Sequence, residues 1–212
     1  MKQSGINGLY AVTPDILDTA VLLDKVCAVL RGGAKVLQYR NKLADSQLRQ
    51  QQAIALRSLT RAYGATFIIN DDVSLALCAE ADGVHLGADD GEISWARAQL
   101  GAGKLIGASC YNQAELARRA VAQGADYVAF GAFYPSSVKP GAVRADMKLL
   151  SAMRDELAVP LVAIGGITLA NGRVLVDAGA DALAVISSVF AAADVEVAAR
   201  EFSKLFLQEA EA

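Results

Sequence analysis

One short turn recurs along this chain, and it constrains the fold more than any other feature. Ala81-Asp82-Gly83, Gly124-Ala125-Asp126 and Gly179-Ala180-Asp181 each follow a helical pattern and open a short apolar run. Gly32-Gly33-Ala34-Lys35 occupies the same place with lysine instead of aspartate. Glycine after a helix supplies the left-handed residue that ends it, and the apolar run that follows is typical of a strand. The repetition of helix, glycine turn and buried strand predicts βα units and a parallel sheet.

Eight apolar runs are the predicted strands of this sheet. They are Gly8–Val12, Val36–Tyr39, Thr66–Asn70, Gly83–Leu86, Leu105–Ser109, Tyr127–Phe130, Leu161–Ile164 and Ala182–Ile186. Helical patterns lie between them, at Leu17–Arg31, Ser46–Tyr63, Gln113–Gln123 and Met147–Leu157. In the first of these, Leu17, Val21 and Leu22 mark the expected buried side. We predict an α/β fold, a single (β/α)8 TIM barrel over residues 1–212. A doubly wound open sheet is the alternative.

Composition agrees with this fold and excludes several functions. The hydrophobic fraction is 54%, and strands buried on both faces account for such an excess. The net charge of −3 argues against nucleic-acid and membrane partners, which usually require a basic surplus. Cys27, Cys78 and Cys110 lack metal-ligand spacing, and the first two are expected to be small buried residues of helices. The N-terminus has no apolar signal core, so we expect a cytoplasmic protein.

The stretch Val36–Lys42 begins as an apolar strand and ends in polar groups. Gln38, Arg40 and Lys42 alternate with other residues, so they share one face at the carboxyl end of the strand. Substrates bind at that end of a parallel sheet, and two cations beside an amide suit a phosphate or diphosphate. The alternative is an edge strand with a solvated polar face.

Carboxylates follow the next two strands. Asp71 comes directly after the third strand, and Asp90 follows the fourth. Magnesium prefers one or two carboxylates together with waters and substrate phosphates, so these two aspartates are the predicted Mg²⁺ ligands. Their neighbours Asp72 and Asp89 are expected to be helix caps or turn residues instead.

Small and polar residues follow the last strands. Gly165-Gly166 and Ser187-Ser188 can offer backbone amides and hydroxyls to a phosphate, a common use of these two loops in barrels. The segment Pro135–Gly141 carries Lys139 and either closes over a ligand or is a solvated connection. His85 is the only histidine, which excludes histidine-based metal sites, and we expect a hydrogen-bonded core role for it.

Together these residues resemble the thiamine-phosphate synthase (thiamine-phosphate pyrophosphorylase) family along almost the whole chain. The resemblance is carried by Leu9-Tyr10-Ala11-Val12-Thr13, Gln38-x-Arg40-x-Lys42, Phe67–Val73, Gly83–Gly87 and Ile164-Gly165-Gly166-Ile167. It implies a (β/α)8 barrel that joins a pyrimidine diphosphate to a thiazole phosphate with Mg²⁺.

The resemblance also implies roles for individual residues. Arg40, Lys42 and Lys139 are implied to be catalytic, and Asp71 and Asp90 are implied to bind Mg²⁺. The implied substrate-binding residues are Gln38, Tyr39, Arg40, Asn41, Lys42, Asn70, Ser109, Ser136, Ser137, Val138, Lys139, Gly166, Ile186 and Ser187.

One position departs from the family pattern. The family loop reads Pro-Thr-x-Thr-Lys, and here it reads Pro135-Ser136-Ser137-Val138-Lys139, so Val138 lacks the second hydroxyl. We expect activity to be retained, with a weaker hold on the thiazole.

The implied mechanism is a dissociative displacement. The cations stabilise the departing diphosphate, and the neutral thiazole nitrogen attacks without a general base.

Three other functions compete with this one. A thiazole tautomerase on the same scaffold would not need the diphosphate and metal residues. A Schiff-base aldolase or phosphosugar isomerase would need a desolvated lysine inside the barrel. A vitamin-phosphate sensor would bind without releasing diphosphate. The chain is expected to act on small molecules as a monomer or homodimer.

Overall fold

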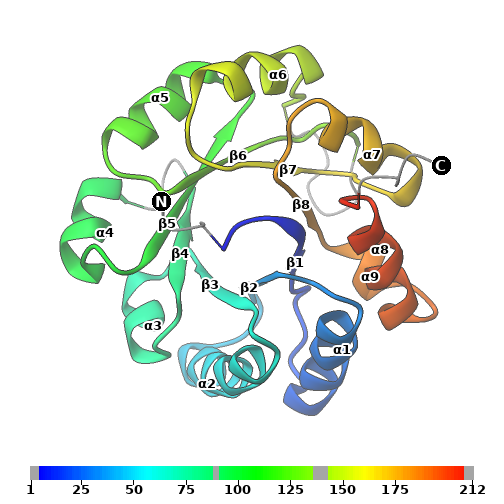
Figure 1. Cartoon of the computed structure of the whole chain (residues 1–212). Helices are drawn as coiled ribbons and strands as arrows, with labels where there is room; N and C mark the ends of the chain where they lie inside the picture. Colours follow the sequence, from blue (N-terminus) through cyan, green and yellow to red (C-terminus); the bar gives the residue numbers. More distant parts are fainter. Residues whose placement is uncertain (1–4, 88–90, 136–142, 208–212) are drawn as a thin grey trace.

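The computed structural model describes residues 5–87, 91–135 and 143–207, and in them eight parallel strands close into a barrel (Figure 1). The strands pair in chain order, and β1 pairs with β8 to complete the ring. They are β1 (Gly8–Val12), β2 (Val36–Tyr39), β3 (Thr66–Asn70), β4 (Gly83–Leu86), β5 (Leu105–Tyr111), β6 (Tyr127–Phe130), β7 (Leu161–Ile164) and β8 (Ala182–Val185). The (β/α)8 barrel is therefore confirmed, and the open sheet is wrong.

Helices surround the ring of strands (Figure 1). They are α1 (Thr19–Arg31), α2 (Ser46–Tyr63), α3 (Val73–Cys78), α4 (Ile93–Leu100), α5 (Ala114–Ala122), α6 (Met147–Glu156), α7 (Leu169–Asp177), α8 (Ser187–Phe190) and α9 (Val195–Lys204). Six strands have the predicted bounds, whereas β5 runs on to Tyr111 and β8 ends at Val185.

Two apolar layers hold the barrel together. The larger lies between the strands and the helices. The smaller fills the barrel interior and includes Tyr10, Ile68, Tyr127 and Val162. Ile6, only 1% exposed, belongs to this inner layer and comes from the segment that leads into β1 and lies across the ring (Figure 1). The interior is thus packed rather than hollow, which leaves the strand ends as the place for a site.

The predicted buried side of α1 is confirmed at Leu22 and wrong at Leu17 and Val21. Leu17 is 53% exposed and Val21 is 44% exposed, whereas Leu22 and Val26 are fully buried. The helix starts at Thr19, capped by the Asp18 carboxylate, so Leu17 precedes it. The buried stripe begins at Leu22 and continues at the helical spacing of four, seven and eight residues.

The recurring turn is a structural clamp at the start of the strands. In each copy the aspartate accepts a hydrogen bond from a backbone amide of the preceding strand: Phe67 to Asp82 (2.8 Å), Ile106 to Asp126 (2.7 Å) and Leu161 to Asp181 (2.7 Å). Each aspartate also accepts from an arginine of the helix that precedes that strand, namely Arg57, Arg97 and Arg154. Lysine, at the Lys35 copy, cannot accept these bonds. The repeat seen in the sequence therefore serves the fold, away from the site.

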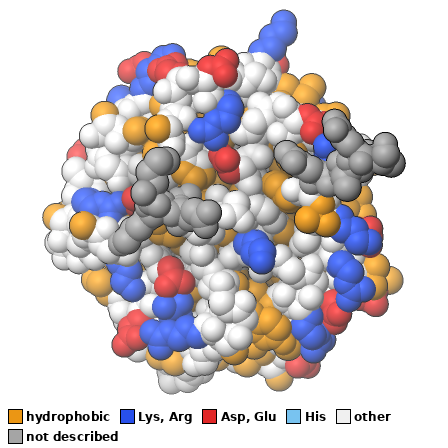
Figure 2. Space-filling model, in the orientation of Figure 1, with side chains coloured by type: hydrophobic (Ala, Val, Ile, Leu, Met, Phe, Trp, Pro, Cys, Tyr) orange, Lys and Arg blue, Asp and Glu red, His pale blue; other side chains and the backbone are white. Residues whose placement is uncertain are grey.

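The surface carries charges of both signs. Figure 2 shows basic and acidic side chains interspersed around the rim of the face drawn, without a large patch of one sign. Over the described ranges, no helix combines the length and apolarity that a membrane crossing requires. Cys78 is exposed at the end of α3 and Cys27 is half-buried, so their expected burial is wrong.

Candidate active site

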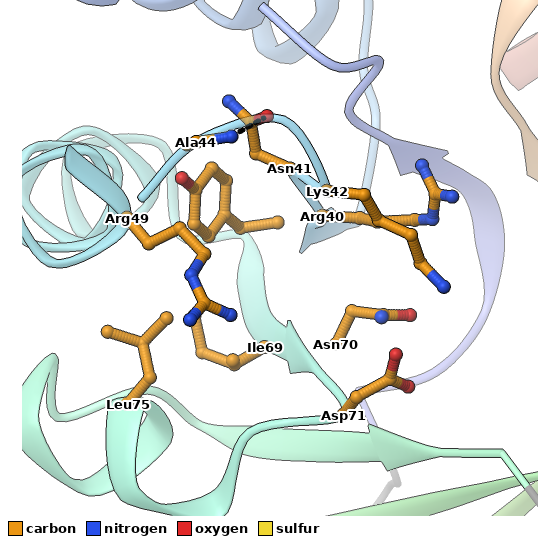
Figure 3. Close-up of a pocket in the computed structure, with 10 residues that line it drawn as sticks. Arg40, Asn41, Lys42, Ala44, Arg49, Ile69, Asn70, Asp71 and Leu75 are labelled. Carbon is orange, nitrogen blue, oxygen red and sulfur yellow. Dashed lines mark hydrogen bonds between the residues drawn. The ribbon is translucent and has the colours of Figure 1, made fainter. Parts of the chain in front are cut away.

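A cleft of about 320 Å³ lies where β2 and β3 end. Polar residues that line it are Arg40, Lys42, Arg49, Asn70 and Asp71. Figure 3 shows the ends of Lys42, Asn70 and Asp71 pointing into the same space, while Arg49 approaches from α2. The structure thus brings together the predicted residues after the second and third strands. Among the described lining residues, three cations and one carboxylate give the site a surplus of positive charge, which suits a polyanion.

The loop after β2 is fixed by residues that follow β1. The Thr13 hydroxyl donates to the Arg40 carbonyl (2.8 Å) and accepts from the Arg40 amide (2.9 Å), so it holds the backbone there. The Asp15 carboxylate accepts from the Lys42 amide (2.6 Å) and pairs with the Arg40 guanidinium (3.3 Å). Asp15 and the buried Thr13 therefore set the position of both cations. These roles were not predicted from the sequence, although the position of polar residues directly after the first strand could have indicated them.

Successive side chains of β2 point to opposite faces of the strand, so Gln38 and Tyr39 lie in different environments. Gln38 is 5% exposed and lies over the barrel interior, where its Nε2 donates to the Tyr10 hydroxyl (2.8 Å). The next residue, Tyr39, packs in the layer between strands and helices, and its hydroxyl donates to Gln52 (2.8 Å). Burial raises the pKa of Tyr39 to about 12.

Asn41 has its side chain committed to the fold. Its Nδ2 donates to the Ile16 carbonyl (2.8 Å), and its Oδ1 accepts from the amides of Leu43 and Ala44. Figure 3 shows the bond to Ala44. Contacts from Tyr39 or Asn41 to a substrate would therefore come from the backbone.

Asp71 has an unusual backbone. Its φ of 64° lies in the left-handed region, which aspartate tolerates better than most residues, and its amide donates to the His85 carbonyl of β4 (2.8 Å). Its neighbour Asp72 caps α3 by accepting from the Leu75 amide (2.8 Å), as predicted. The chain direction thus changes at Asp71, which turns one carboxylate to the cleft and the next to the helix. The second predicted metal ligand, Asp90, lies outside the described residues.

Arg49 lines the cleft but was not predicted as a site residue. Its nearest carboxylate is Asp72, at 3.8 Å. Its Nε is buried and has no hydrogen-bond partner among the residues the structure describes. A buried N–H group without a partner costs free energy, so this guanidinium can gain from an incoming anion. Arg49 lies on α2, seven residues after Lys42. Nothing in the sequence singles it out, because exposed arginines are common on helices.

A second cleft, of about 200 Å³, lies across the mouth of the barrel at the ends of β7 and β8. Its lining includes Gly166, Ile186 and Ser187, all predicted, and also Gly165 and Thr168.

The glycine pair in this cleft is required by the backbone. Gly165 and Gly166 have φ values of 101° and 62°. A Cβ atom at Gly166 would lie 2.3 Å from the Pro135 carbonyl oxygen, so only glycine fits. The Ser188 hydroxyl donates to the Ile167 carbonyl (2.7 Å), which leaves Ser187 as the serine open to a ligand.

Ser109 lies near the carboxyl end of β5 and lines a third cleft, of about 290 Å³. Its hydroxyl is 2.9 Å from Nε2 of His85, whose Nδ1 is 3.1 Å from the Tyr127 hydroxyl. His85 therefore has the expected hydrogen-bonded role in the core. Cys110 is buried, and burial raises the pKa of its thiol to about 12, so the structure gives no support to a catalytic thiolate there.

The remaining predicted residues fall outside the described ranges. They are Ser136, Ser137, Val138 and Lys139.

Comparison with known proteins identifies the family. A family model described as thiamine monophosphate synthase matches residues 9–189. The thiamine-phosphate synthase of Methylobacillus flagellatus is 57% identical over 201 residues, which make up 95% of this chain and 96% of that protein. The thiamine-phosphate synthase of Azoarcus sp. is also 57% identical over 201 residues, with 95% and 98% covered.

Solved structures agree with this result. The thiamine phosphate pyrophosphorylase from Pyrococcus furiosus has a TM-score of 0.82 and 36% identity, and the match covers 93% of this chain and 94% of that one. A 3-hexulose-6-phosphate synthase, at 21% identity and a TM-score of 0.71, shares the fold alone. The predicted family is confirmed: the chain belongs to the thiamine-phosphate synthases, a family of transferases.

Proposed function

We propose that this chain condenses 4-amino-5-hydroxymethyl-2-methylpyrimidine diphosphate with thiazole phosphate to give thiamine phosphate and diphosphate. The observation that carries the proposal is the pair of clefts on opposite sides of the barrel mouth. One is lined by three cations and the other by a glycine pair and a helix start. Two phosphorylated substrates held at these places would meet over the closed end of the barrel.

The β2–β3 cleft would hold the diphosphate. Arg40 and Arg49 offer forked N–H donors, and Lys42 offers a point charge on a flexible stem. Arg40 is already paired with Asp15, so part of its charge is neutralised before a substrate arrives. Lys42 is exposed, and its ammonium is free to follow the diphosphate as charge builds on it. Asn70 adds an amide from the same side.

The donors in this cleft also fit a magnesium ion. Asp71 contributes one carboxylate beside a predicted diphosphate site, and Mg²⁺ commonly needs only one or two carboxylates besides substrate oxygens. Across the described part of the chain, no group of three or more His, Cys, Asp or Glu residues could hold a metal, so a cage built only from protein is not indicated there. Asp71 and Asp90 would hold the ion, which when bound would neutralise charge on the departing diphosphate.

The β7–β8 cleft would hold the thiazole phosphate. The backbone at Gly166 lets a phosphate approach the main chain closely, and the amides of Ile186 and Ser187 lie on the neighbouring strand end. The role proposed for Ser136, Ser137, Val138 and Lys139, over the bound substrates, rests on the family resemblance.

The reaction breaks one bond and forms another. The bond between the pyrimidine methylene carbon and the diphosphate oxygen breaks, and its electron pair leaves with the diphosphate. The lone pair of the thiazole nitrogen then forms the new C–N bond to that carbon, so no proton needs to move. Arg40, Lys42 and Lys139 would stabilise the negative charge of the leaving group, which is the main electrostatic demand of the step.

The test is to incubate the protein with both substrates and Mg²⁺ and to measure diphosphate and thiamine phosphate together. Equal amounts of both products are expected, and EDTA should stop their formation. Lys42→Met should reduce the rate strongly, whereas Lys204→Met, at the end of α9, should not. Binding of thiazole phosphate without turnover would point to a tautomerase or a sensor instead.

A Schiff-base aldolase finds little support. The buried polar or charged residues that the structure describes are Thr13, Gln38, Asn41, Gln52, Thr60 and His85. No lysine is among them, and a desolvated lysine is what that reaction needs.

A further inference from the structure

The Asp15 carboxylate lies against the cations of the β2–β3 cleft. Each of its oxygens lies 3.3 Å from Nη1 of Arg40, and Oδ1 also accepts from the Lys42 amide at 2.6 Å. The side chains of Arg40 and Asp15 are 15% and 30% exposed, so water screens their attraction only in part. A negative charge at this place opposes the binding of any polyanion to the cleft.

The loop that carries Asp15 is anchored on its carboxyl side by neutral groups. Asn41 and Gln52 both donate to the Ile16 carbonyl, at 2.8 and 3.0 Å. Gln52 is fully buried on α2, and its Nε2 also lies 3.3 Å from the Leu17 carbonyl. These bonds fix the backbone directly after Asp15 without using its charge.

The amino side of the loop is anchored in the same way. The fully buried Thr13 hydroxyl bonds both the amide and the carbonyl of Arg40. The remaining bond, from the Lys42 amide to Asp15, needs only an oxygen acceptor, and an asparagine side chain supplies one as well. The fold therefore uses an acceptor at Asp15 but does not depend on a negative charge there.

The ion pair of Asp15 is long for its kind. Charge-assisted N–H···O bonds usually measure about 2.7–2.9 Å. In the pair that secures the start of β3, the guanidinium of Arg57 lies 2.7 and 2.8 Å from the Asp82 oxygens. Arg40 instead lies 3.3 Å from both oxygens of Asp15, through one nitrogen. The Arg40 guanidinium therefore loses little when it turns to another oxyanion, and a diphosphate would compete with Asp15 for it.

The proposed reaction makes release of the leaving group a demand on this cleft. Diphosphate gains negative charge when its bond to carbon breaks, so a cluster of cations binds the free product more tightly than the substrate ester. Arg40, Lys42 and Arg49 line the cleft together and would retain that product. A fixed carboxylate beside one of the three cations lowers this affinity.

We propose that Asp15 is a positioning residue that competes with diphosphate for Arg40 and so weakens the hold of the cleft on the released product. The role rests on the proposed function, since it names how the same site lets its leaving group go. The carboxylate keeps Arg40 at the cleft before a substrate arrives, and it takes the guanidinium back as diphosphate leaves.

Asp15→Asn separates the charge from the hydrogen bond, because the amide oxygen can still accept from the Lys42 amide. The dissociation constant of inorganic diphosphate, measured by calorimetry with Mg²⁺, should fall about fivefold, the upper value for a partly exposed ion pair. KM for the pyrimidine diphosphate should fall as well, and kcat should not rise, because bound substrate gains the same attraction. A purely structural role predicts the opposite sign, since a displaced loop binds anions less well.

Asp177→Asn is the matched control. Asp177 pairs with Arg173 at 2.8 Å on α7 and lines none of the three clefts described, so this substitution removes an equal charge from the partner of another arginine. It should leave the dissociation constant of diphosphate unchanged. An equal tightening in both variants would reflect net charge alone and would overturn the role of Asp15.

The other outcomes are equally decisive. Unchanged or weaker binding of diphosphate by Asp15→Asn would overturn the proposal. A variant that does not fold would overturn it too, because the loop would then depend on the charge. If the unmodified protein binds diphosphate but forms no thiamine phosphate, the proposed function fails, while the ratio of the two dissociation constants still decides the role of Asp15.

Discussion

The aspartate–arginine clamp at Asp82 is expected to contribute strongly to stability. Asp82 accepts two hydrogen bonds from the Arg57 guanidinium, at 2.7 and 2.8 Å, and one from the Phe67 amide at 2.8 Å. The Arg57 side chain is 14% exposed, and Phe67 is fully buried. Asp82→Ala would leave both donors without an acceptor in places that water reaches poorly.

The expected cost can be built from these contacts. An unsatisfied buried amide costs about 1–3 kcal/mol, and breaking a buried ion pair costs about 3–5 kcal/mol. The Asp82 side chain is 34% exposed, so water can reach part of the arginine once the carboxylate is gone. We therefore expect a loss of about 3 kcal/mol in the free energy of unfolding, a large part of the ~5–15 kcal/mol of a typical protein. Asp82→Asn keeps one acceptor and should lose about half as much.

Equilibrium unfolding in urea measures this loss, provided that the slope of the transition stays the same. Glu156→Ala is the matched control, because Arg118 and Glu156 form an equally short pair, at 2.6 and 2.8 Å, on the exposed surface. Solvent screens that pair, so Glu156→Ala should hardly change the urea concentration at the midpoint of unfolding. Equal losses for Asp82→Ala and Glu156→Ala would refute the reasoning, because burial and the backbone bond would then not matter.

Two further predictions concern the cleft and the thiols. Arg49→Met should raise KM for the pyrimidine diphosphate about tenfold without lowering stability, since its buried Nε has no partner among the described residues; an unchanged KM would remove Arg49 from the diphosphate site. Iodoacetamide at pH 8 should label exposed Cys78 quickly and leave Cys110 unlabelled until the protein unfolds, because burial raises the pKa of Cys110 to about 12. Peptide mass spectrometry separates the two sites, and rapid native labelling of Cys110 would contradict the packing of β5.

The strands were predictable because each is a short apolar run between turn residues, and this signal is local. The clearest case is the run that opens at Gly83, where Asp82 both ends the turn and bonds the neighbouring strand. The buried side of α1 was not predictable in the same way. Leu17 is as apolar as Leu22, and only the start of the helix at Thr19 decides which of them faces the barrel.

The sequence predicted site residues only where they follow a strand. Arg40, Lys42 and Asp71 follow strands directly, so the barrel rule places them at the mouth. Arg49 reaches the same cleft from a helix, and no local pattern distinguishes it from a surface arginine.

A network of hydrogen bonds through the barrel interior shows why such a gap arises. Gln38 and Ser109 are separated by 71 positions and by two strands of the ring, β3 and β4, yet the buried side chains of Tyr10, Tyr127 and His85 connect them through hydrogen bonds. Each of those side chains, taken alone, looks like a core residue, and His85 was interpreted that way. Only the closed barrel aligns them, because strands on opposite sides of the ring face each other across its interior. Such a network is a property of the closed barrel and not of any single segment of the sequence. It therefore becomes visible only when the fold is known.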